Sequence, residues 1–164
     1  QKERRIAIKD KKELHEQAER AIDQCQEMID HFHQQVEPVF GEFTEEEKTN
    51  FNEIIERGRK DITEFRTHLS KTSEKVDAQI ESAYKDNKIH TEEKLKLFEE
   101  VIGYAETAET VVNYMTNMDT ELSDFVEKFN ESRSADTPEN KDMETAETVD
   151  VEQNNETSTK EENQ

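Results

Sequence analysis

The chain has 164 residues, enough for one domain of ordinary size, but only 30% of them are hydrophobic while 39% are charged. So little apolar surface excludes a thick multilayer core and favours a slim helical bundle in which each helix buries one narrow stripe. The formal net charge of −20 argues against binding to nucleic acid and against adsorption to an anionic membrane surface, because both depend on cationic side chains.

The first predicted helix covers residues 2–36. Its apolar residues recur at steps of three and four, as expected for one buried helix face: Leu14, Ala18, Ala21, Ile22, Cys25, Met28, Ile29, Phe32 and Val36. Pro38 ends this helix, and the residues that follow it form a turn. We expect Phe40 and Phe43 in this turn to cover one end of a bundle, where they are candidate partner-contact residues.

The second predicted helix, 44–86, is the longest uninterrupted stretch and would extend about 60 Å at about 1.5 Å per residue. Thr44 precedes three glutamates, and Glu47 completes a capping box with it. The apolar and small residues again follow helical spacing: Phe51, Ile54, Ile55, Gly58, Ile62, Phe65, Leu69, Val76, Ile80, Ala83 and Tyr84. A helix of this length is stable only if that stripe packs against other helices.

The third predicted helix, 91–131, follows a short polar connection and is capped by Thr91. Ile89 and His90, in the connection before it, are the second pair of candidate partner-contact residues. Its predicted buried stripe is Leu95, Phe98, Val101, Ile102, Ala105, Ala108, Val112, Met115, Met118, Leu122, Phe125, Val126 and Phe129. Short connections favour antiparallel neighbours, so the sequence predicts an all-α, elongated, antiparallel three-helix bundle, coiled-coil-like, over residues 1–131.

Residues 132–164 differ in composition from the rest of the chain. They carry ten acids and three bases and show no apolar periodicity. This composition predicts a disordered acidic C-terminal tail.

The sequence offers little that could carry catalysis, so we expect a protein that is not an enzyme and that uses no cofactor. His31 and His33 are two residues apart and point to different helix faces, which argues against a shared metal ion. Asp30 and His33 have the spacing of a Glu-x-x-His metal motif, with aspartate in place of glutamate. Helical metal sites of this kind need a pair of such motifs on facing helices, and this one occurs once. Cys25 lies on the core stripe, where a thiol behaves as a small apolar group.

Three segments resemble the YkyA-type cell-wall-binding lipoproteins of Gram-positive bacteria. They are the turn Val36–Phe40 with the acidic helix start Thr44–Glu47, the apolar patch and turn from Ile80 to Ile89, and the helix end Phe125–Asn130. The similarity extends over about residues 11–130. The chain has fewer tyrosines and lysines than that family along the second helix, and its acidic tail is unusual for it.

The resemblance implies an exported lipoprotein domain on the outer face of the cytoplasmic membrane, anchored by a lipid-modified cysteine upstream of Gln1. We expect this domain to be a monomer. Its partner would be a cell-wall component or a surface protein. Because an acidic chain is repelled by anionic wall polymer, a protein or a cation-bridged partner is favoured. The alternative function is a cytosolic coiled-coil adaptor that acts through protein–protein interaction.

Overall fold

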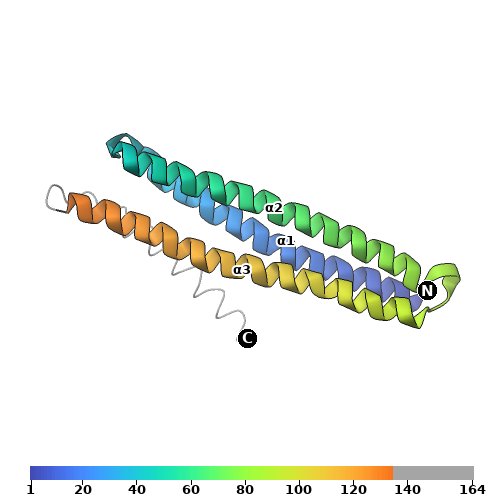
Figure 1. The fold of residues 1–164 in the computed structure, drawn as a ribbon. Helices are drawn as coiled ribbons and strands as arrows, with labels where there is room; N and C mark the ends of the chain where they lie inside the picture. The colour runs from blue at the N-terminus through green and yellow to red at the C-terminus, as the bar shows by residue number, and fades with distance from the viewer. Residues whose placement is uncertain (135–164) are drawn as a thin grey trace, which may run out of the picture. The chain divides into compact units, whose positions relative to one another are not determined.

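The computed structural model describes residues 1–134 and shows an all-α protein (Figure 1). Its three helices are α1 (Lys2–Val36), α2 (Glu45–Ala83) and α3 (Thr91–Arg133). Two short 3-10 turns, Glu37–Glu42 and Lys85–Asn87, connect them. No strand occurs in the described part of the chain. The predicted all-α, three-helix class is therefore confirmed, whereas the predicted acidic tail lies outside the described residues from 135 onward.

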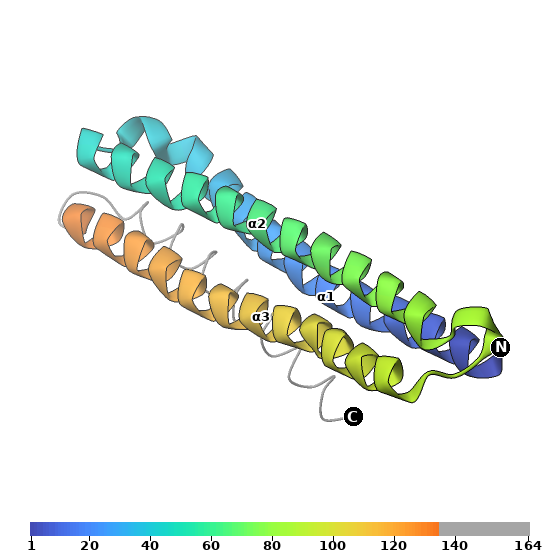
Figure 2. The same ribbon diagram turned by 45° about the vertical axis from the view of Figure 1, so that its right-hand side comes forward.

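The helices form two compact units, and each unit contains a segment of all three helices. The first unit comprises residues 1–27 and 57–114. The described part of the second comprises residues 28–56 and 115–134. In each unit the α2 segment runs opposite to the α1 and α3 segments (Figure 2).

The start of α2 follows from local hydrogen bonding at Thr44. The backbone N–H of Thr44 donates to Glu47 Oε1 at 2.8 Å, and the backbone N–H of Glu47 donates to Thr44 Oγ1 at 3.1 Å. This reciprocal pair is a capping box, which satisfies two N–H groups that a helix N-terminus leaves without intrahelical partners.

The turn after α2 contains two residues with left-handed backbone conformation. Asp86 and Asn87 have φ values of 56° and 58°. Aspartate and asparagine are the non-glycine residues that adopt this region most readily. The backbone N–H of His90 then donates to the carbonyl of Ala83 at 2.8 Å, which closes the turn before α3.

The core of the first unit contains residues from all three helices. The α1 and α2 contributions follow the predicted stripes, with Ile22, Leu69 and Val76 at most 4% exposed. In α3 the buried apolar residues are instead Leu97, Tyr104 and Val111, seven residues apart.

The predicted stripe is therefore wrong in the first half of α3. Leu95, Phe98, Ile102 and Val112, which were placed in the core, are between 52% and 59% exposed. The helix carries apolar residues on two different faces, and both satisfy a three-and-four spacing. The face with Leu97 and Tyr104 is the buried one.

The core of the second unit is rich in aromatic side chains and matches the predicted stripes. In α3, Met118, Leu122, Val126 and Phe129 are each at most 2% exposed. Phe32 of α1 lies against Phe51 of α2, with ring centroids 5.6 Å apart.

Candidate functional site

Phe43, a candidate partner-contact residue, lies inside an aromatic cluster of the second unit. Its side chain is 5% exposed. Four phenylalanine ring centroids lie 5.0–6.2 Å from its own: Phe40, Phe51, Phe125 and Phe129. Such tilted and edge-on pairs add to the burial energy of the rings.

Phe40, the other candidate at this end, is half-buried. Its ring centroid lies 5.7 Å from that of Phe51, and Lys48 Nζ lies 5.6 Å from the Phe40 centroid. Phe40 is therefore the more accessible of the two, and its role as a partner contact stays a prediction.

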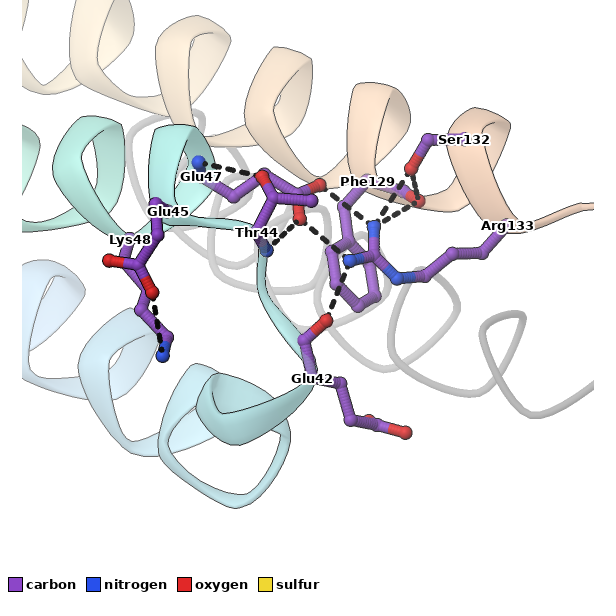
Figure 3. Close-up of polar contacts among 8 residues, drawn as sticks. All are labelled: Glu42, Thr44, Glu45, Glu47, Lys48, Phe129, Ser132 and Arg133. Atoms are coloured by element: carbon purple, nitrogen blue, oxygen red, sulfur yellow. Dashed lines mark hydrogen bonds and ion pairs between the residues drawn. The ribbon is translucent and has the colours of Figure 1, made fainter.

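Arg133, near the end of α3, joins the cluster to the start of α2 (Figure 3). Its Nη2 donates to Glu47 Oε1 at 2.6 Å and its Nη1 donates to Glu47 Oε2 at 2.8 Å. Nη2 also donates to the backbone carbonyl of Glu42 at 2.8 Å. The guanidinium carbon lies 4.0 Å from the centroid of the Phe129 ring. One side chain thus makes a bidentate ion pair, a bond to the turn and a cation–π contact.

The Glu47 carboxylate is the electrostatic centre of this arrangement. The hydrogen bonds from Arg133, together with that from the Thr44 backbone, hold the pKa of Glu47 below its ordinary value. The hydrogen-bonded carboxylate in turn raises the pKa of Arg133. The arrangement stabilises the fold at this end, because both charges are satisfied by each other and neither is available as an acid or base.

Ile89 and His90, the second candidate pair, lie in the first unit beside the N-terminus. Ile89 is 55% exposed, and His90 Nε2 lies 3.2 Å from the carbonyl oxygen of Lys85. A shallow pocket of about 180 Å³ adjoins Ile89. The side chains that line this pocket are mixed in charge: Gln1, Lys2, Glu3, Arg4, Tyr84, Asn87, Lys88 and Ile89.

The histidines of α1 make separate contacts. His33 stacks on Phe51 with centroids 5.8 Å apart, and His31 Nε2 lies 3.5 Å from Gln35 Nε2. Within residues 1–134, no group of three or more His, Cys, Asp or Glu side chains is placed to hold a metal ion.

Cys25 lies beside a half-buried polar pair of the first unit. Tyr114 donates its hydroxyl hydrogen to Asp61 Oδ2 at 2.7 Å, and burial together with this bond raises the pKa of Tyr114. Burial, and then the Asp61 carboxylate, raise the pKa of Cys25 to about 11. These neighbours favour the protonated thiol, which is not a nucleophile.

We therefore expect Cys25 to be inert in the folded protein. At pH 8 only about one thiol in a thousand is ionised when its pKa is about 11, and the side chain is fully buried. Titration with a chromogenic disulfide should show very slow reaction in native buffer and one rapidly reacting thiol in denaturant. Equal rates in the two solutions would contradict this assignment.

The exposed side chains Leu95, Phe98, Ile102 and Val112 form what we call the α3 stripe. Their spacing places them on one face of the helix, different from the face that carries Leu97, Tyr104 and Val111. Because Leu95 and Ile102 are also seven residues apart, the heptad repeat of the buried set does not separate the two faces in the sequence. The α3 stripe is thus a surface that sequence reasoning missed.

Comparison with curated proteins and with solved structures finds no match for this chain. No helix of residues 1–134 is long and apolar enough to cross a membrane. The family of effectors from the type III secretion system matches residues 32–155, which is 124 of the 164 residues.

This match corrects the functional reading of the sequence. The resemblance to YkyA-type lipoproteins is wrong, and with it the predicted wall-binding function and location on the outer face of the cytoplasmic membrane. Nor does the match favour the alternative of a cytosolic adaptor. The segments that carried the resemblance are a proline turn, an acidic helix start and an apolar helix end, which suit any antiparallel set of helices. The chain belongs to the family of type III secretion system effectors.

Proposed function

We propose that this protein is exported by a type III secretion system into a host cell, where it acts by binding a host protein rather than by catalysis. The observation that carries the first part is the family match over about three quarters of the chain. The second part is supported by the exposed surface described below.

The support for binding is the distribution of apolar side chains. Within residues 1–134, seven large apolar side chains are exposed, and four of them form the α3 stripe. Contiguous exposed apolar surface is typical of interaction sites, whereas scattered single residues are ordinary. The pocket beside Ile89 is small by comparison with ligand pockets, which usually enclose about 300–1,000 Å³.

A translocation assay tests the export. A reporter enzyme that is active only in host cytosol is fused to the C-terminus of the full-length gene product. We expect reporter activity in host cells exposed to bacteria with an intact type III system. Bacteria that lack the ATPase of that system should give none, although they produce the fusion at the same level. Equal reporter activity from both strains would overturn the proposal.

Crosslinking of the delivered protein tests the mode of action. If the protein acts by binding, its effect on the host cell should stop increasing once the amount of delivered protein is comparable to the amount of the crosslinked host protein. A chemical change in a host component that continues to accumulate at a trace, constant amount of the protein would indicate turnover and contradict a binding role.

A further inference from the structure

The α3 stripe is one helix face, on which the exposed Glu109 separates Val112 from Leu95, Phe98 and Ile102. Leu95 is 59% exposed, Phe98 57% and Ile102 54%, and the intervening helical position 105 is an exposed alanine. From residue 95 to Val112 the face extends about 26 Å at about 1.5 Å per residue. This length corresponds to about five helical turns, which matches one amphipathic helix laid alongside.

Folding of the first unit does not need this face. A different face of α3 already carries Leu97, Tyr104 and Val111, which are at most 5% exposed. Gly103 also faces α2 closely, since a Cβ added there would lie 3.2 Å from Thr72 Cγ2. The helix is therefore anchored through its buried side, whereas Leu95, Phe98 and Ile102 are exposed on another side.

The stripe is bordered by acidic side chains. Glu92, Glu99 and Glu106 recur every seven residues along one edge, and all three are exposed. Residues 91–112 contain six glutamates and two lysines, a net charge of −4. Both lysines are already in ion pairs, Lys94 with Glu3 and Lys96 with Glu93. The charge that this surface presents to a partner is negative.

This charge selects among possible occupants. A second copy of the chain would bring two acid-bordered faces and two net charges of −20 together. Residues 135–164 of the same chain carry ten acids and two lysines, so they are repelled as well. An anionic lipid surface is disfavoured for the same reason. A cationic partner is attracted, and its apolar side chains can cover the stripe.

We infer that the α3 stripe is the docking surface for an amphipathic helix of a partner protein, one whose apolar face is flanked by lysine or arginine. Such a helix places apolar residues at i, i+3 or i+4, and i+7 against Leu95, Phe98 and Ile102. Its cations lie beside Glu99 and Glu106. The inference names the partner class of the binding role proposed above.

The test uses the full chain and three synthetic peptides of about five turns. The first is helical, with leucines on one face and lysines on its flanks. The second has the same composition in an order that forms no apolar face, and the third has glutamate in place of lysine. Fluorescence anisotropy at about 0.05 M and about 0.5 M salt measures binding, since screening separates charge from apolar contact.

We expect the first peptide to bind at least about tenfold more tightly than the other two. The double variant Phe98→Ser with Ile102→Ser should weaken its binding by about tenfold or more. The matched control is Ile6→Ser with Ile8→Ser, which removes two apolar side chains of similar exposure from α1 and should leave binding unchanged. Circular dichroism should show that both variants keep the helical fold.

A second pair of variants tests the charge. Glu99→Gln with Glu106→Gln should reduce both the affinity and its salt dependence, whereas Glu13→Gln with Glu16→Gln on α1 should change them less. Equal binding of the first and second peptides, or no effect of the Phe98 and Ile102 changes, would overturn the inference. Two other results would also overturn the inference. One is a dimer in sedimentation that the Phe98 and Ile102 changes abolish, and the other is binding to zwitterionic vesicles that the same changes abolish. Because the assay involves no secretion, its failure is separate from failure of the export proposal.

Discussion

Replacement of Phe43 by alanine should lower the free energy of unfolding by about 3–5 kcal/mol, the largest effect that we expect from one substitution in this protein. Phe43 is 5% exposed and contacts four other phenylalanine rings of the second unit. Truncation removes all of these contacts and leaves a cavity that neighbouring rings can fill only in part. Urea unfolding followed by circular dichroism measures the change.

Phe98→Ala is the matched control for this experiment. It removes the same side chain from a position that is 57% exposed, so we expect a change within about 0.5 kcal/mol. Phe43→Leu keeps most of the buried volume, so its loss of unfolding free energy should lie between those of Phe43→Ala and Phe98→Ala. Equal losses for Phe43→Ala and Phe98→Ala would show that the aromatic cluster does not support the fold as its geometry indicates.

Replacement of Arg133 by methionine should lower the free energy of unfolding by about 2 kcal/mol. Methionine keeps the apolar stem over Phe129 but leaves Glu47 without its bidentate partner. We expect less than the roughly 3–5 kcal/mol typical of a fully buried pair, because the two side chains remain 18% and 19% exposed. Arg133→Lys should recover only part of the loss, since one ammonium cannot bind both carboxylate oxygens and the Glu42 carbonyl together.

The pH dependence of the Arg133 effect has a definite sign. The folded-state pKa of Glu47 is lowered, so the pair contributes fully above the ordinary glutamate value of 4.5. Its contribution is lost as the pH falls from that value through the lowered folded-state pKa. The difference in unfolding free energy between the parent chain and Arg133→Met should therefore be constant near neutral pH and shrink in acid.

The other carboxyl groups titrate in the same way in the parent chain and in Arg133→Met. Their contribution therefore cancels in the difference between the two unfolding free energies. Lys48→Met is the control, because its ion pair with Glu45 is exposed and spans only three residues. A difference between the parent chain and Arg133→Met that grows on acidification would contradict the assignment of Glu47 as the partner.

The parts of the fold that depend on neighbouring residues could be predicted from the sequence. The capping box of Thr44 and Glu47 and the polar turn at Asp86 and Asn87 are each encoded within a few residues. The buried face of the first half of α3 could not be predicted in this way. Two faces fit a helical period there, and the choice depends on how Tyr104 packs and how closely Gly103 approaches Thr72.

The site was harder to predict than the fold, for the same physical reason. Phe43 was expected to cover one end of the bundle, but the partners that bury it, Phe125 and Phe129, lie more than 80 residues further along the chain. The role of Arg133 depends on a carboxylate 86 residues away. The exposure of the α3 stripe follows only once the other face is known to be buried.

The separation between Glu47 and Arg133 has a consequence for the order of folding. In the first unit, α2 and α3 are joined by contacts as local as Gln79 with Glu93, which are 14 residues apart. Closing a loop of 86 residues costs about 1.6 kcal/mol more chain entropy than closing one of 14. The α2–α3 hairpin should therefore nucleate at the Asp86–Asn87 turn, with the Arg133 contacts forming late. Changes at Arg133 should then accelerate unfolding while leaving the refolding rate nearly unchanged.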